Sequence, residues 1–223
     1  MKTKRKLQLA VDVLMTAILM LQMSYSLAGE LLHEITGILF FALFVIHHIV
    51  TVNYTKALLK GKRTADKVIK LSVDIVLLVI VICMLLSAVP ISKHLFTFLG
   101  INRFSSLGRT VHLLGAYWGF ALINIHIGFH LDKMLNKPLK DKRKKPVVIA
   151  VMLLISGLGL YFFISEEVYK YMLLINRFVF LGASEGPALF LLKYIFIGGM
   201  FESLAYLLIR SIKSKNHRSQ QKE

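Results

Sequence analysis

Two stretches of this sequence repeat one another: residues 29–47 read GELLHEITGILFFALFVIH, and residues 108–126 read GRTVHLLGAYWGFALINIH. The glycine that opens each stretch and two histidines occupy the same places, and a Phe-Ala-Leu triplet at residues 41–43 recurs at 120–122. Each stretch is long and apolar, which predicts a helix. We therefore expect two equivalent helices, each with one histidine near either end.

The histidines are His33 and His47 in the first stretch and His112 and His126 in the second, 14 residues apart in both. Fourteen residues are close to four helical turns, so the two imidazoles of each helix project from one face, ~21 Å apart along the axis. An imidazole inside a membrane helix is costly and usually marks a functional site. The duplicated pattern favours that interpretation over pH sensing or interhelical hydrogen bonding.

The composition places the chain in a membrane. Of its 223 residues 56% are hydrophobic, and the mean hydropathy is +0.66. Several apolar runs approach the ~20 residues that a helix needs to cross a bilayer. The first run is not a removable signal peptide, because no small-residue cleavage site ends a short apolar core. We expect an all-α integral membrane bundle of about six transmembrane helices, over residues 7–26, 30–54, 68–89, 110–133, 147–164 and 187–209.

The net charge of +16 predicts a membrane orientation rather than a nucleic-acid contact. Four segments hold 22 of the 28 lysines and arginines, at residues 2–6, 56–70, 133–145 and 210–222. They alternate with connections that hold few, as the positive-inside rule requires of a multi-pass protein. We predict a protein of the cell membrane, in contact with the lipid bilayer and with no nucleic acid, whose termini both lie in the cytoplasm.

The helix before each histidine helix also repeats, since residues 10–13 read AVDV and residues 72–75 read SVDI. Residues 1–133 are therefore predicted to form a four-helix core made of a duplicated two-helix unit. Its copies lie at about 7–54 and 68–133, followed by a basic cytoplasmic linker (134–146), a two-helix membrane unit (147–210) and a polar tail (211–223).

The four histidines suit two haem b groups, each with two axial imidazoles. In the predicted topology His33 and His112 lie near the outer side, and His47 and His126 lie nearer the cytoplasm. Because the two helices run in the same direction, equal depth pairs His33 with His112 and His47 with His126. Each Nε2 would bind iron while an acceptor holds Nδ1–H. A zinc site is less favoured, because each level offers only two obvious ligands. The single cysteine, Cys83, excludes a disulfide and a cysteine-based iron–sulfur cluster.

Two further histidines leave alternatives open. His48 and His130 contact haem propionates or a quinone in one interpretation, and in the other they are interfacial histidines without chemistry. His48 also competes with its neighbour His47 as the inner ligand, and the repeat favours His47.

Three charged residues are equally ambiguous. Asp12 and Asp74 are either acceptors or proton carriers near the inner haem, or carboxylates stabilised by a helix N-terminus. Arg109 lies one turn before His112, where it either pairs with a propionate of the outer haem or is a solvated charge.

The duplicated histidine segments resemble the flavinylation-associated cytochrome family, formerly a domain of unknown function. More distantly, they are similar to the dihaem membrane cores of cytochrome b and ferric reductases. The resemblance covers about residues 7–133 and implies a b-type cytochrome that passes electrons across the membrane to an extracytoplasmic flavoprotein carrying covalent FMN. It implies iron ligands at the matching positions His33, His47, His112 and His126.

The sequence shows no phosphate loop, dinucleotide fingerprint or nucleophile–base constellation, which favours an electron-transfer cytochrome over a stand-alone enzyme. Its donor would be cytoplasmic or the quinone pool. A second interpretation is the quinone-reactive cytochrome anchor of a larger oxidoreductase. A third is a non-redox transporter or structural membrane protein with pH-sensing histidines.

Overall fold

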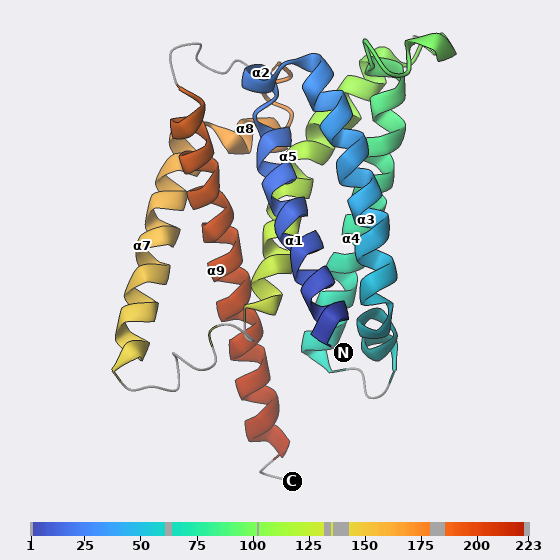
Figure 1. Cartoon of the computed structure of the whole chain (residues 1–223). Coiled ribbons are helices and arrows are strands. Elements are labelled where there is room, and N and C mark those ends of the chain that lie inside the picture. The colour runs from blue at the N-terminus through green and yellow to red at the C-terminus, as the bar shows by residue number, and fades with distance from the viewer. Residues whose placement is uncertain are drawn as a thin grey trace. The chain divides into compact units, whose positions relative to one another are not determined.

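The computed structural model describes residues 2–60, 64–101, 103–131, 135, 143–178 and 186–220, and these contain helices and no strand. The long helices are α1 (Lys2–Met23), α3 (Glu30–Leu59), α4 (Ala65–Ala88), α5 (Ser105–His130), α7 (Lys144–Ser165) and α9 (Pro187–Gln220). Short helical segments follow or join them: α2 (Tyr25–Ala28), η1 (Val89–Ile91), η2 (Thr97–Leu99) and α8 (Val168–Met172). The predicted all-α architecture is confirmed (Figure 1).

Within the described residues, six helices are long and apolar enough to cross a membrane, in spans of 20 to 30 residues. Their outer surfaces carry many exposed leucines, isoleucines and valines; on α7, for example, Leu153 and Leu154 are more than half exposed. Such surfaces would be unfavourable in water, whereas a bilayer solvates them while the helices satisfy their own backbone hydrogen bonds.

Several helices extend beyond their predicted ends. The first begins at Lys2 rather than residue 7, α3 continues to Leu59, and α9 continues to Gln220. The extensions of α1 and α9 are rich in lysine and arginine, and that of α3 has the sequence TKALL. Lysine, arginine, alanine and leucine are good helix formers, so a helix can continue past its membrane-spanning part. By contrast, α4 ends at Ala88, immediately before the segment that contains Pro90.

One glycine fixes the entry to the first histidine helix. Gly29 separates α2 from α3 with φ 82° and ψ 163°, a backbone conformation that side chains strongly disfavour. The following residue, Glu30, begins α3, and the N–H of His33 donates to the Gly29 carbonyl in the first helical turn. The position of His33 in that turn therefore depends on this glycine.

Contacts divide the chain into two compact units, each built from separate segments. The first unit comprises Met1–Lys62, Val79–Ala116 and Lys170–Leu191. Within it, α1 packs along α3 (Figure 1).

The second unit comprises Arg63–Leu78, Tyr117–Tyr169 and Leu192–Glu223. Its buried cluster joins α5 and α9, and α4 residues pack against it; the members are Phe129, Ala205 and Ile209, with Ile69, Val73 and Ile125 beside them. The predicted division into a 1–133 core, a linker and a two-helix addition stays a prediction. Residues 134 and 136–142 of that linker and 221–223 of the tail lie outside the described residues.

Glycines allow two helices of the second unit to approach α9 closely. A Cβ added at Gly128 of α5 would lie 2.4 Å from the carbonyl oxygen of Glu202, and one at Gly159 of α7 would lie 2.3 Å from that of Phe196. Both distances are too short for any real side chain. Small residues at such positions are typical of helices packed in membranes, where van der Waals contact drives association.

Candidate histidine site

His33 of α3 and His112 of α5 face one another within the first unit. Their ring centroids lie 6.0 Å apart, with an interplanar angle of 68°. A metal–imidazole bond of ~2 Å places the metal ~3 Å from the ring centroid, so two imidazoles on opposite sides of one ion have centroids ~6 Å apart. The observed separation is compatible with two imidazoles on opposite sides of one metal ion, and it is also that of an ordinary edge-to-face contact between two rings.

An acceptor on α4 orients His112. The hydroxyl of Ser87 is buried and donates to the Met84 carbonyl at 3.0 Å, so its oxygen lone pairs remain for a donor. Nδ1 of His112 lies 3.3 Å from this oxygen. The imidazole is then protonated on Nδ1 and carries its ligand lone pair on Nε2.

His33 has different surroundings. Its buried Nδ1 has no hydrogen-bond partner among the described residues, and neither does the nearby side-chain oxygen Oε1 of Gln22. The Gln22 amide donates instead to the backbone carbonyl of His33, at 3.3 Å. The ring of Tyr25 meets the imidazole edge to face, with centroids 5.1 Å apart. Buried polar atoms normally have partners, so the unpaired Nδ1 is unusual.

A carboxylate holds His47. Its Nδ1 lies 2.8 Å from Oδ1 of Asp12, which links α3 to α1 in the first unit. A carboxylate accepts but does not donate, so Nδ1 carries a proton, and in the neutral imidazole the lone pair lies on Nε2. This pairing of histidine with carboxylate is the arrangement that commonly orients metal-binding imidazoles.

The same contact recurs in the second unit. Nδ1 of His126 lies 2.7 Å from Oδ1 of Asp74, which links α5 to α4. The two contacts join positions that the sequence repeats relate to each other. Asp12 and Asp74 therefore both contact histidines, as the acceptor interpretation of these carboxylates requires.

His48 is placed differently from His47. It is exposed, its Nδ1 lies 2.9 Å from the carbonyl oxygen of Phe44 in its own helix, and the two rings lie 4.2 Å apart. Successive residues of a helix point about 100° apart, so only one of the two histidines can face Asp12. That residue is His47.

The other predicted site residues are His130 and Arg109, both on α5. The half-buried ring of His130 lies 4.9 Å from that of His126. Arg109 is exposed near the start of α5. The predicted contacts of Arg109, His48 and His130 with propionates or quinone remain predictions.

Glu34, which follows His33, anchors the segment after η1. Its carboxylate accepts from the hydroxyl of Ser92 at 2.8 Å and from the backbone N–H groups of Lys93 (2.7 Å), His94 (3.3 Å) and Leu95 (2.8 Å). The connection that leads toward α5 is thereby fixed to the first turns of α3.

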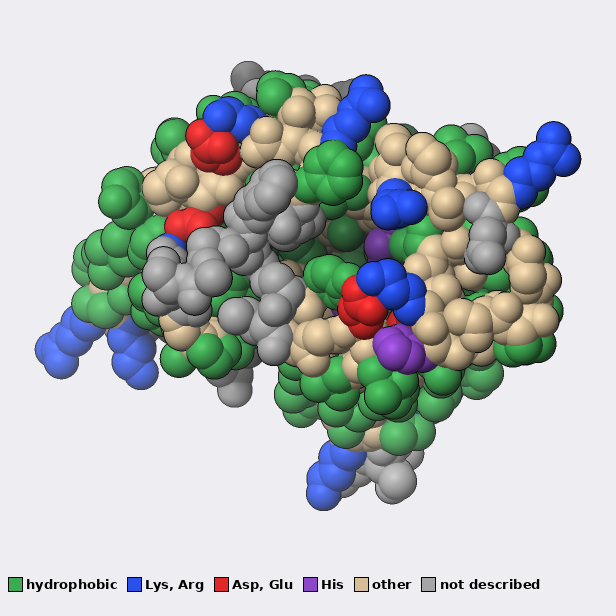
Figure 2. Space-filling model, turned by 90° about the horizontal axis from the view of Figure 1, so that it is seen from above, with side chains coloured by type: hydrophobic (Ala, Val, Ile, Leu, Met, Phe, Trp, Pro, Cys, Tyr) green, Lys and Arg blue, Asp and Glu red, His purple; other side chains and the backbone are tan. Residues whose placement is uncertain are grey.

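A charged cluster lies beside this segment. Lys93 pairs with Glu30, which also accepts from the Tyr25 hydroxyl at 3.2 Å, and His94 lies 4.0 Å from the same carboxylate. Figure 2 shows acidic, basic and histidine side chains side by side on the face seen from above. The bond to Glu30 raises the pKa of Lys93, and partial burial together with Glu30 raises the pKa of Tyr25.

Sequence reasoning missed Tyr25 and Ser87, which contact His33 and His112. A signal was present: Asp12 and Asp74 are 62 residues apart, and so are Tyr25 and Ser87. Extending the first-helix repeat to its outer end would have placed Tyr25 near His33 and Ser87 near His112.

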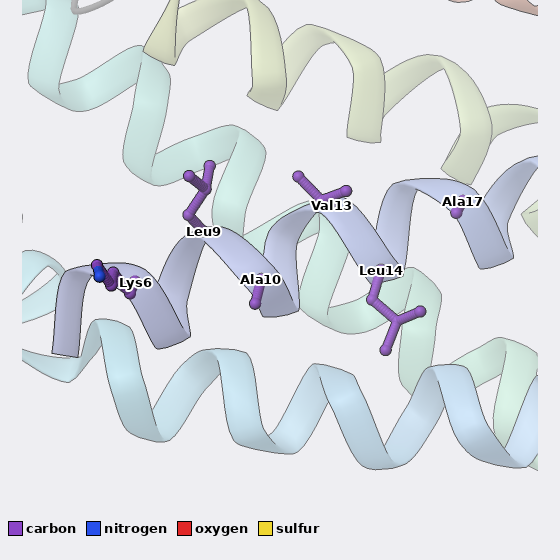
Figure 3. A pocket seen from close by; sticks show the side chains of 6 residues that line it. All are labelled: Lys6, Leu9, Ala10, Val13, Leu14 and Ala17. Atoms are coloured by element: carbon purple, nitrogen blue, oxygen red, sulfur yellow. The ribbon is translucent and has the colours of Figure 1, made fainter. Parts of the chain in front are cut away.

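The described residues contain no group of three or more histidine, cysteine, aspartate or glutamate side chains that could hold a metal ion. A shallow depression of about 470 Å³ lies along α1 and includes none of the candidate histidines (Figure 3). It is apolar apart from one lysine, with Lys6, Leu9, Ala10, Val13, Leu14 and Ala17 as its lining.

Comparisons with protein-family models, with curated proteins and with solved structures found no match for this chain.

Proposed function

We propose that this chain is an integral membrane b-type cytochrome that binds two bis-histidine haems and carries electrons across the bilayer. The observation that carries the proposal is the pair of equivalent contacts from His47 to Asp12 and from His126 to Asp74. Each contact fixes the tautomer that presents Nε2 as a ligand. Two intramembrane imidazoles held in this way, at equivalent positions of a repeat, are hard to explain by packing alone.

The residues present fit haem better than a bare metal ion. The macrocycle supplies four of the six ligands of its iron, so each site needs only two imidazoles from the protein. The spacing of His33 and His112 supports this at the outer site. Bound haem would supply a one-electron iron couple, while the chain orients the imidazoles and excludes water from them.

The proposed architecture is a duplicated two-helix unit, with α1 and α3 as one copy and α4 and α5 as the other. The recurrence of the aspartate–histidine contact supports it. By equal depth in the two copies, His33 and His112 hold the outer haem, and His47 and His126 hold the inner one. The distribution of lysine and arginine supports cytoplasmic termini in the cell membrane.

Electrons would enter from a cytoplasmic or quinone donor and leave to an acceptor outside the membrane. A flavoprotein with covalent FMN is the class of acceptor that the family resemblance implies. The charged cluster of Glu30, Lys93 and His94 lies close to Tyr25, and Tyr25 touches His33. This short path from the outer histidine to exposed side chains supports electron exit at this end.

The test is the reduced-minus-oxidised absorption spectrum of the purified protein after expression with sufficient haem. We expect a b-type spectrum and two haems per chain, unchanged in the matched control His94→Ala, because His94 lies in an exposed connection. A correctly folded protein without a reducible haem would overturn the proposal and favour a non-redox role for the histidines.

A further inference from the structure

The acceptors of the four histidines differ between the two proposed haems. Both inner histidines, His47 and His126, place Nδ1 within 2.8 Å of a carboxylate oxygen. Of the outer histidines, His112 lies 3.3 Å from a neutral hydroxyl, and Nδ1 of His33 has no partner among the described residues. The inner haem is therefore the one whose ligands carry anionic acceptors.

This difference has a direct consequence for iron. An anionic acceptor draws the Nδ1 proton toward itself, which makes the imidazole a stronger electron donor. A stronger donor stabilises ferric over ferrous iron and lowers the reduction potential, which hydrogen bonding around the ligands is known to tune. A neutral acceptor at longer distance has a smaller effect.

One carboxylate near the outer pair requires separate consideration. Glu34 follows His33, but its oxygens accept from Ser92 and from the backbone N–H groups of the next three residues. Glu34 acts on His33 through its charge, without a hydrogen bond to the imidazole, whereas Asp12 lies 2.8 Å from Nδ1 of His47. Because the proposed effect on the ligand depends on that direct hydrogen bond, Glu34 does not reproduce the effect of Asp12 on His47.

We propose that Asp12 and Asp74 set the reduction potential of the inner haem below that of the outer haem, which makes electron transfer from the inner to the outer site favourable. With both haems bound, the electron that the inner iron would lose on becoming ferric would reduce the outer iron to the ferrous state, with no proton and no further reactant. The two aspartates are positioning residues that act through their histidines. This inference rests on the proposed function and adds a direction to it.

The test is a redox titration of the purified protein, followed by its haem absorption. The variant His112→Ala, which should retain only the inner haem, identifies the lower of the two potentials. Asp12→Asn and Asp74→Asn keep the shape and an acceptor oxygen but remove the charge. Each should raise the reduction potential of the inner haem. For this one-electron couple, a shift of about 59 mV corresponds to a tenfold change in the ratio of reduced to oxidised iron.

The matched control is Asp66→Asn, which removes a carboxylate in the first turn of the same helix as Asp74. It should leave both potentials unchanged. If one of the asparagine variants does not retain haem, the proposal is still tested by the other variant and by the order of the two reduction potentials in the unmodified protein.

The outcomes separate the two proposals. Two haems with the inner potential higher, or an inner potential that neither asparagine variant changes, would overturn this inference and leave the cytochrome function standing. Absence of haem from the folded unmodified protein would overturn the proposed function itself.

Discussion

Replacing His47 and His48 one at a time tests the inner haem site most directly. His47→Ala removes a proposed iron ligand, so we expect bound haem to fall from two per chain to one. His48→Ala removes an exposed ring that contacts Phe44 and His47 of its own helix. It should keep both haems and change the free energy of unfolding by ~0.5 kcal/mol or less.

The structure also gives the cost of His47→Ala without haem. The change leaves Asp12 without the imidazole nitrogen that lies 2.8 Å from its oxygen. Hydrogen bonds to charged groups contribute ~1.5–3 kcal/mol, and the 40% exposure of the Asp12 side chain reduces this to about 1 kcal/mol. The fold should therefore survive, and any loss of haem reports on ligation.

Haem per chain is measured from the absorption of the haem against protein concentration, and folding from thermal unfolding of the same samples. If His47→Ala retained both haems while His48→Ala lost one, the inner ligand would be His48, and the inference from the Asp12 contact would be refuted. If both variants retained two haems, neither residue would be an inner ligand.

Three further predictions follow from the same geometry. The double change His33→Ala with His112→Ala should leave one haem per chain, whereas crossed pairing of the histidines would leave none. Gly159→Ala should destabilise the protein by ~1–3 kcal/mol in thermal unfolding, because its Cβ would meet a carbonyl of α9, while Gly157→Ala, with open space around it, should be nearly neutral. A reporter fused to the C-terminus should be cytoplasmic and one inserted in the 90–109 connection external; the reverse would invert the proposed electron path.

Local sequence determined the helices and the histidine spacing. A long apolar run satisfies its backbone only as a helix in a bilayer, so the six long helices could be predicted within a few residues at most ends. Two histidines 14 residues apart share a face because the helical period is fixed. The ends of α1, α3 and α9 were less predictable, because residues that are good helix formers follow or precede the apolar spans and can continue the helix beyond the membrane.

Tertiary structure decided which atoms meet these histidines. A helix that is rotated by 100° about its axis keeps its whole local sequence pattern, yet it would turn His48 instead of His47 toward α1. Only packing fixes that rotation, and it brings Asp12 to His47 and Asp74 to His126. The sequence placed these carboxylates at the right depth, but helix-end charge remained an equally good explanation until the contacts were seen.

The partners of the outer histidines depended even more on packing. The sequence repeat relates Ser87 to Tyr25, but it does not show that the Ser87 hydroxyl lies 3.3 Å from Nδ1 of His112. Nor does it show that the buried Nδ1 of His33 lacks a hydrogen-bond partner among the described residues. Hydrogen bonds between helices depend on the rotation and depth of each helix to better than one residue. Hydrophobic periodicity shows which face of a helix is apolar but does not define its rotation and depth that closely. The sequence therefore determined the four histidines and their spacing. Only the packed helices show that two of them contact a carboxylate, that one contacts a hydroxyl and that Nδ1 of the fourth has no partner among the described residues.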